Sequence, residues 1–248
     1  MRARSFTSIK VTVSALVLMT ATASGASQNE PGSMRIEPYV LKGFKGQTAR
    51  AELGHLLVPE NRSNPASRQI ELTFIRFRNA GISGPPLVYL VGGPGNSAYY
   101  VARYTLGSAL QSALRQSGDL IFLEQRGTSK SNPNLKCDEE VNYPLDKPLE
   151  LGELLRLYRE SSGQCANRWR ERGVDLTGYN TNESADDIEA LRKSLGVEKL
   201  NLFGGSYGTH LALATVRRHE TGINRVIIAG VEGPDHTYKL PSNLEKYL

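Results

Sequence analysis

The chain has 248 residues, of which 39% are hydrophobic and 22% charged, a composition that fits a folded domain and excludes a disordered protein. Its net charge is +5, but Arg2, Arg4 and Lys10 lie in a leader without acids, which leaves about +2 (5 minus 3) for the rest. We expect no nucleic-acid partner, because binding to a polyanion needs clustered Lys and Arg side chains.

The first 26 residues have the three-part pattern of a secretory signal peptide. The basic start precedes an apolar run over residues 11–22 and then small residues, with A-T-A at 21–23 and S-G-A at 24–26 as candidate cleavage sites. An uncleaved anchor is the alternative, but about a dozen apolar residues are too few to span a bilayer. We expect a secreted or periplasmic protein with no stable membrane anchor after cleavage, and a flexible leader over residues 27–46.

The sequence contains two cysteines, Cys137 and Cys165. A pair of cysteines in an exported protein predicts a disulfide, and two free buried thiols are the alternative. Neither cysteine has a neighbouring His or C-x-x-C spacing, so we expect no metal, and no cofactor is implied.

The hydrophobic pattern changes along the chain. Residues 49–59 predict an extended segment, and residues 69–78 alternate between apolar and polar, as in an antiparallel strand with one wet face. A helical stripe covers residues 183–195, with acids at its start and Gly196 just beyond its end. Short apolar runs, typical of strands buried on both faces of a parallel sheet, occupy residues 86–91, 120–123, 200–203 and 226–229. Residues 47–248 therefore predict an α/β core with a mostly parallel sheet, an antiparallel N-terminal ribbon and helices on both faces.

The most specific motif is G-x-S-x-G, formed by Gly204, Ser206 and Gly208. It directly follows a strand pattern and precedes a helical one, which is the context of a nucleophile elbow. In such a turn the glycines let strand and helix approach, and the serine oxygen is exposed above the sheet. We predict that Ser206 is a catalytic nucleophile, and the alternative is a purely structural turn.

A glycine-rich loop, V-G-G-P-G-N over residues 91–96, follows the first buried strand pattern. Such a turn can direct backbone N–H groups toward a developing oxyanion. Pro94 has no N–H, so we expect Gly93 and Tyr207 to be the two donors. A phosphate-binding loop is disfavoured because the sequence lacks G-x-G-x-x-G and the Walker lysine, whereas a structural turn stays an alternative.

A third loop, E-Q-R-G-T-S over residues 124–129, is by itself an ordinary polar turn. In the order G-G-P-G, Q-R-G-x-S and G-G-S-Y-G, however, the three loops resemble the prolyl iminopeptidase and tripeptidyl-aminopeptidase-like branch of the α/β-hydrolases. The resemblance covers about residues 51–235, including the cysteine pair. It implies an α/β-hydrolase fold in which the first loop supplies the oxyanion hole, the second braces the site and the third holds the nucleophile. This sequence departs from the family pattern at Val91, Glu124 and Ser129, where the family has His, Asp and Gly.

The resemblance also implies an acid and a histidine downstream of the nucleophile, after a cap domain. Residues 207–248 hold only weak candidates, Asp235 and His236, because adjacent side chains do not easily form the Ser–His–Asp line. His210 is expected along the elbow helix, away from the serine oxygen, and His219 as a cap at its end. We therefore expect a chain truncated before the cap and the last strands, and of low activity by itself.

Together these patterns predict an exported serine hydrolase, a peptidase that releases residues from the amino end of peptides through an acyl-enzyme on Ser206. Its partner would be a peptide or a small acyl substrate, and oligomeric state and side-chain preference are not predicted. Two alternatives remain, a carboxylic-ester hydrolase of the same fold and a non-catalytic fragment or pseudoenzyme without the triad acid and base.

Overall fold

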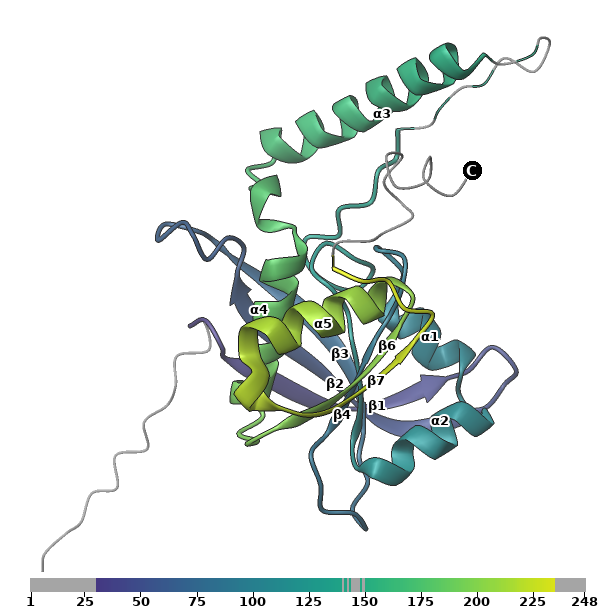
Figure 1. Cartoon of the computed structure of the whole chain (residues 1–248), viewed down its shortest axis with the longest axis vertical. Coiled ribbons are helices and arrows are strands. Elements are labelled where there is room, and N and C mark those ends of the chain that lie inside the picture. The colour runs from purple at the N-terminus through teal and green to yellow at the C-terminus, as the bar shows by residue number, and fades with distance from the viewer. Residues whose placement is uncertain (1–29, 140, 142, 144–147, 149, 235–248) are drawn as a thin grey trace, which may run out of the picture.

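A seven-stranded mixed sheet organises the computed structural model, which describes residues 30–139, 141, 143, 148 and 150–234. The strand order is β1-β2-β3-β5-β4-β6-β7, with helices on both faces of the sheet (Figure 1). The leader over residues 1–26 and the pair Asp235 and His236 lie outside the described residues. This arrangement confirms the expected mixed, mostly parallel α/β architecture.

The first three strands form the antiparallel part of the sheet. They are β1 (Met34–Lys42), β2 (Thr48–Pro59) and β3 (Gln69–Phe77), paired in chain order. The expectation of a flexible leader over residues 27–46 is wrong for β1, which pairs with β2 along its whole length. Its apolar signal is weak because most of its side chains are at least partly exposed, and Leu41 is the residue that it buries fully.

The remaining strands are parallel to one another and match the four apolar runs. All four side chains of the run 120–123 are buried, as expected for a strand covered on both faces. The same expectation is wrong for residues 226–229, which are partly exposed because their strand lies at the edge of the sheet. They are β4 (Leu87–Leu90), β5 (Leu120–Leu123), β6 (Leu200–Gly205) and β7 (Ile223–Ala229). Because β4 lies between β5 and β6, the segments that follow these three strands leave the sheet side by side.

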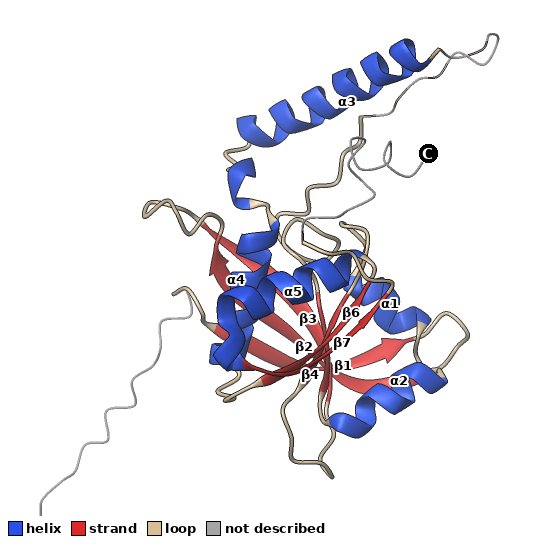
Figure 2. Cartoon of the chain, in the orientation of Figure 1, coloured by secondary structure: helices blue, strands red, loops and turns tan. Residues whose placement is uncertain are grey.

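Helices cover both faces of the sheet (Figure 2), and a hydrophobic cluster lies between the sheet and the helices on each face. On one face α4 (Thr181–Ser194) and α5 (Tyr207–His219) pack through residues such as Ile188 and Leu211. On the other face lie α1 (Ala98–Tyr104) and α2 (Ala109–Leu114). Three short 3₁₀ turns complete the described elements: η1 (Arg115–Ser117), η2 (Leu176–Gly178) and η3 (Glu220–Gly222).

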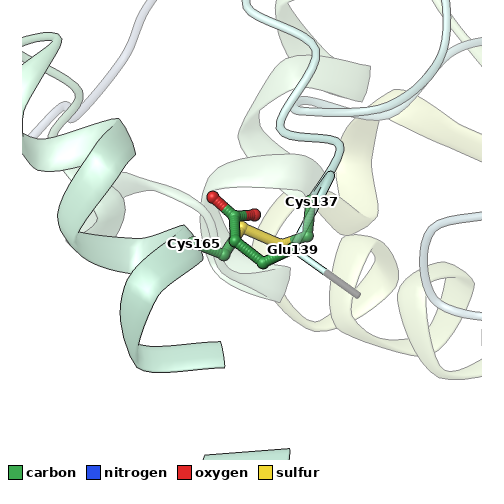
Figure 3. Close-up of side chains that lie close together, drawn as sticks. All are labelled: Cys137, Glu139 and Cys165. Atoms are coloured by element: carbon green, nitrogen blue, oxygen red, sulfur yellow. A yellow bond between two sulfur atoms is a disulfide. The ribbon is translucent and has the colours of Figure 1, made fainter. Parts of the chain in front are cut away.

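The longest helix, α3 (Leu151–Glu171), lies apart from the sheet (Figure 1). A disulfide between Cys137 and Cys165 ties it to the segment that follows the third loop, which confirms the predicted pairing (Figure 3). Arg168 of α3 also pairs with Glu139 at 2.5 Å, and this hydrogen bond lowers the pKa of Glu139 to about 2. The two sulfurs are bonded to each other and Glu139 is paired with Arg168, so the disulfide and the ion pair together attach α3 to the segment around Cys137. None of the described helices has the length and apolar character needed to cross a bilayer.

Replacing both cysteines by serine should loosen α3 selectively. The disulfide joins residues that are 28 positions apart, and removing such a bond costs about 3 kcal/mol in the chain-entropy account. Hydrogen exchange should therefore speed up at the α3 amides, whereas amides of the buried strand β5 serve as the internal control. Equal protection of α3 in the two proteins would contradict a structural role for the bond.

Candidate active site

Three segments from three neighbouring strands meet at the carboxyl edge of the sheet. Residues 91–96 follow β4, residues 124–129 follow β5, and Ser206 follows β6. Ligands of such open α/β sheets bind at this edge, where the strands end. The topology thus brings together all three loops that the sequence singled out.

Ser206 occupies a strained turn between β6 and α5. Its backbone has φ 52° and ψ −126°, a conformation that costs a residue with a side chain about 1–3 kcal/mol. Two neighbours hold it there: its N–H donates to the Ala229 carbonyl at 3.0 Å, and its own carbonyl accepts from the N–H and the hydroxyl of Thr209 at 2.8 and 2.7 Å. The side chain is left exposed, as expected of a nucleophile elbow.

The two glycines of the motif are required by close backbone contacts. A Cβ added at Gly204 would lie 2.5 Å from the Gly208 carbonyl oxygen, and one added at Gly208 would lie 2.0 Å from the Leu90 carbonyl oxygen. Neither distance is compatible with a side chain. The glycines therefore let the first turn of α5 lie directly against the ends of β6 and β4.

The glycine-rich loop lies against the side chain of Ser206. A Cβ added at Gly92 would be 3.0 Å from the Ser206 Cβ and 3.4 Å from its Oγ. Gly93 has φ +118°, and a side chain there would crowd the N–H groups of Gly95 and Asn96 at 2.9 and 3.0 Å. The structure thus explains why glycines occupy this turn, one of which touches the candidate nucleophile.

Glu124 of the third loop is a structural residue, a role that the composition of the loop did not indicate. Its side chain is 1% exposed and accepts four hydrogen bonds between 2.7 and 3.0 Å. The donors are the Ser97 and Thr128 hydroxyls and the N–H groups of Ala98 and Tyr99. Glu124 therefore fastens the start of α1, and with it the end of the glycine-rich loop, to the end of β5.

Two further contacts link the third loop to the first. The Gln125 amide donates to the Val91 carbonyl at 3.1 Å, directly before the glycines. Ser129, where the related family has Gly, has φ 39°, and its Oγ lies 2.9 Å from the Ser97 Oγ. The left-handed backbone explains the family's glycine, and the hydroxyl contact offsets part of the strain of about 1–2 kcal/mol that a serine incurs there.

Arg126 anchors the third loop to α4 through a buried ion pair. Its guanidinium bonds both oxygens of Asp187 at 2.8 and 2.7 Å and the carbonyls of Glu60 and Gly178 at 2.6 Å. Both charged side chains are 2% exposed. Arg62 binds Asp187 as well; burial lowers its pKa, but Asp187 and Glu183 outweigh burial and raise it above its usual value. Arg62 thus stays charged, and both arginines are paired with Asp187.

A carboxylate contacts the candidate nucleophile directly. The Ser206 Oγ donates to Glu232 Oε1 at 3.0 Å, and the Glu232 N–H donates to the Thr209 Oγ1 at 2.7 Å. Glu232 was not among the sequence-predicted site residues, although it is the first acid past the end of β7, at the edge where the other loops meet. Asp235 and His236, the weak candidates for the triad acid and base, lie outside the described residues.

The two described histidines of α5 form other contacts. The His210 ring stacks on Tyr207 with 5.6 Å between centroids, and its Nδ1 is 3.3 Å from the Gly233 carbonyl oxygen. His219 was expected to cap α5, but its Nε2 lies 2.7 Å from Asp186 of α4. Because α5 packs against α4, the Asp186 carboxylate lies within hydrogen-bond distance of His219, and the histidine binds it.

An open groove of about 1100 Å³ runs between the start of α4 and the outer side of α5. Thr181, His210 and Pro234 are among its lining residues, but Ser206 is not. We therefore place the candidate active site at the junction of the three loops, where the exposed serine hydroxyl lies, and not in this groove.

Comparisons with known proteins agree with the loop motifs. The sequence profile of the alpha/beta hydrolase fold family matches residues 85–248. Tripeptidyl aminopeptidase of Streptomyces coelicolor is 30% identical over 195 residues, 74% of this chain and 35% of the relative. Serine protease Hip1 of Mycobacterium tuberculosis is 28% identical over 191 residues, 73% of this chain and 36% of the relative. Proline iminopeptidase of Xylella fastidiosa is 24% identical over 153 residues, 60% of this chain and 33% of the relative. The chain spans about a third of the length of these curated relatives.

The elbow geometry predicts a large loss of stability on substitution of one glycine of the turn and almost none on substitution of another. Gly208→Ala should lower the free energy of unfolding by about 3 kcal/mol, because the added methyl group collides with the Leu90 carbonyl. Gly205→Ala is the matched control: a Cβ there has nothing within 4 Å, so its effect should stay within about 1 kcal/mol. Urea denaturation of both variants measures the difference, and equal stabilities would show that the strand and helix are not packed this closely.

Proposed function

Because the chain belongs to the α/β-hydrolase fold family, we propose that it is an exported serine peptidase that releases residues from the amino end of peptides through an acyl-enzyme on Ser206. The observation that carries this proposal is the strained, exposed Ser206 with the glycine-rich loop against its side chain. A turn with positive φ favours glycine. Strain at a residue with a side chain is typical of positions where that side chain performs chemistry.

In this mechanism the Ser206 Oγ attacks the carbonyl carbon of the substrate, and the carbonyl oxygen becomes an oxyanion. The N–H groups of Gly93 and Tyr207 bind that oxygen. Tyr207 is the first residue of α5, so its N–H belongs to the helix start, which favours negative charge. The leaving group departs, and water then hydrolyses the acyl-enzyme.

The substrate class and the location are supported by separate observations. The relatives named above are a tripeptidyl aminopeptidase, a serine protease and a proline iminopeptidase, which favours peptide substrates with a free amino end. The signal-peptide pattern of residues 1–26 favours export. The disulfide between Cys137 and Cys165 fits an oxidising compartment.

Replacing Ser206 by alanine should abolish covalent labelling by a fluorophosphonate and leave the melting temperature nearly unchanged, because one exposed hydroxyl is lost. Turnover of aminoacyl and peptidyl amides should be compared with that of simple esters in the same preparations. Ester turnover without amide turnover would favour a carboxylic-ester hydrolase. Labelling that persists in Ser206→Ala would remove the nucleophile assignment.

Gly93→Ala should slow acylation about 100- to 1,000-fold, the usual cost of losing one oxyanion donor. Gly95→Ala is the matched control, because Gly95 also has a positive φ of +98° but open space around an added Cβ. Both variants carry backbone strain, whereas only Gly93→Ala also displaces the proposed donor. Burst-phase acylation and thermal melts of both proteins test this, and equal acylation rates would exclude Gly93 as a donor.

A further inference from the structure

We propose that the tip of the β1–β2 hairpin and the outer side of α1 form a docking surface for membranes that contain anionic lipids. The contact is reversible and needs no membrane-spanning segment. It uses three aromatic and three basic side chains, which we call the aromatic patch: Phe44, Tyr100, Tyr104, Lys42, Lys45 and Arg103. The inference does not involve Ser206 and is independent of the proposed function.

The three aromatic rings of the patch form one exposed row. The ring centroids of Phe44 and Tyr100 lie 4.8 Å apart, and those of Tyr100 and Tyr104 lie 6.3 Å apart. Phe44 is 49% exposed, Tyr100 54% and Tyr104 70%. Single exposed apolar side chains are ordinary on a protein surface, whereas a contiguous group of them marks a binding surface.

Arg103 holds the two parts of the patch together. Its guanidinium lies over the Phe44 ring, 4.2 Å from the centroid, and its Nε donates to the Lys42 carbonyl at 2.8 Å. The turn of the hairpin, which carries Phe44 and Lys45, is thereby fastened to the last turn of α1. The rings and the cations are thus arranged side by side before any partner binds.

The segments that build the patch carry positive charge without compensating acids. Residues 38–51 and residues 72–118 contain no Asp or Glu. Lys42 and Lys45 are exposed, and neither pairs with a carboxylate in the part of the chain that the structure describes. The patch is therefore an aromatic surface surrounded by cations.

This combination is complementary to an anionic lipid surface. Tyrosine rings are enriched at the level of the lipid headgroups, and each Lys or Arg near an anionic membrane strengthens binding about fivefold. A second copy of the chain is a poorer occupant, because a two-fold interface would place the three cations of one patch against the same cations of the other.

The hairpin tip lies away from the candidate active site. Both β2 and β5 are antiparallel to β3, so β2 runs in the direction of the parallel strands. The tip directly precedes β2 and therefore lies where the parallel strands begin, at the margin of the molecule in Figure 1. Ser206 follows the other end of these strands, so a membrane bound at the patch leaves it accessible.

Sedimentation of the 248-residue chain with lipid vesicles tests the charges. Lys42→Gln combined with Lys45→Gln should weaken binding to vesicles of equal parts phosphatidylglycerol and phosphatidylcholine about 25-fold, or about fivefold per charge. On vesicles of phosphatidylcholine alone this difference should disappear. The control is Lys136→Gln with Lys193→Gln, two exposed lysines outside the patch, which changes the net charge equally and should leave binding within about twofold. All variants keep residues 1–26, so differences between them report the patch.

A tryptophan reporter tests which side chains enter the lipid. Phe44→Trp places an indole in the patch, and Tyr158→Trp places one on α3 at a residue of similar exposure, 48%. The single native tryptophan is common to both proteins. Vesicles with brominated acyl chains should quench the fluorescence of Phe44→Trp and leave that of Tyr158→Trp unchanged. Thermal melts of all variants exclude unfolding as the cause.

Two results would overturn the inference. One is an unquenched indole at position 44, even if the chain sediments with vesicles, because the cations would also attract a soluble acidic partner, which has no acyl chains. The other is an equal loss of binding in the two lysine pairs, which would assign the binding to net charge. Fluorophosphonate labelling of Ser206 should be the same in all these variants, so this inference and the proposed function can fail separately.

Discussion

The first turn of α5 approaches the end of β4 so closely that a single carbon added at Gly208 would lie 2.0 Å from the Leu90 carbonyl oxygen. With the helix this close, the chain has one residue in which to turn from β6 into α5, and Ser206 takes the strained backbone that this turn requires. The strand that the helix touches is also the strand that leads into the glycine-rich loop. The same contact thus fixes the backbone of Ser206, the proposed nucleophile, and sets the glycine-rich loop beside it.

Buried polar side chains hold the neighbouring loops in place around the contact between α5 and β4. Glu124 accepts hydrogen bonds from three donors at the start of α1 and from the Thr128 hydroxyl in its own loop. Arg126 binds Asp187 and two backbone carbonyls. Removing one partner of a buried ion pair leaves the other charge without compensation, which costs about 3–5 kcal/mol. The loops are therefore held by buried interactions that are expensive to break.

The parts of the fold that local pattern determines were predictable from the sequence. The run 120–123 coincides with β5, and the glycines around Ser206 predicted the elbow because their spacing reflects a local backbone requirement. The strand β1 was missed because it is stabilised by pairing with β2 and buries little of its own surface. The contacts of Glu124 and Glu232 were missed for a related reason. Glu124 binds Ser97, 27 residues away, and Glu232 binds Ser206, 26 residues away, and nothing in the local sequence indicates such contacts.

The exposed hydroxyl of Ser206 and the enclosed glycines beside it come under different kinds of selection. The hydroxyl contributes little to packing, so a lineage that no longer needs catalysis can lose it by drift while the protein still folds. Gly204 and Gly208 are under selection for as long as the chain must fold, because each occupies space that a side chain cannot share. In descendants of this gene, retained glycines would therefore show that the fold is kept, and a retained serine would show that the proposed hydrolysis is still selected.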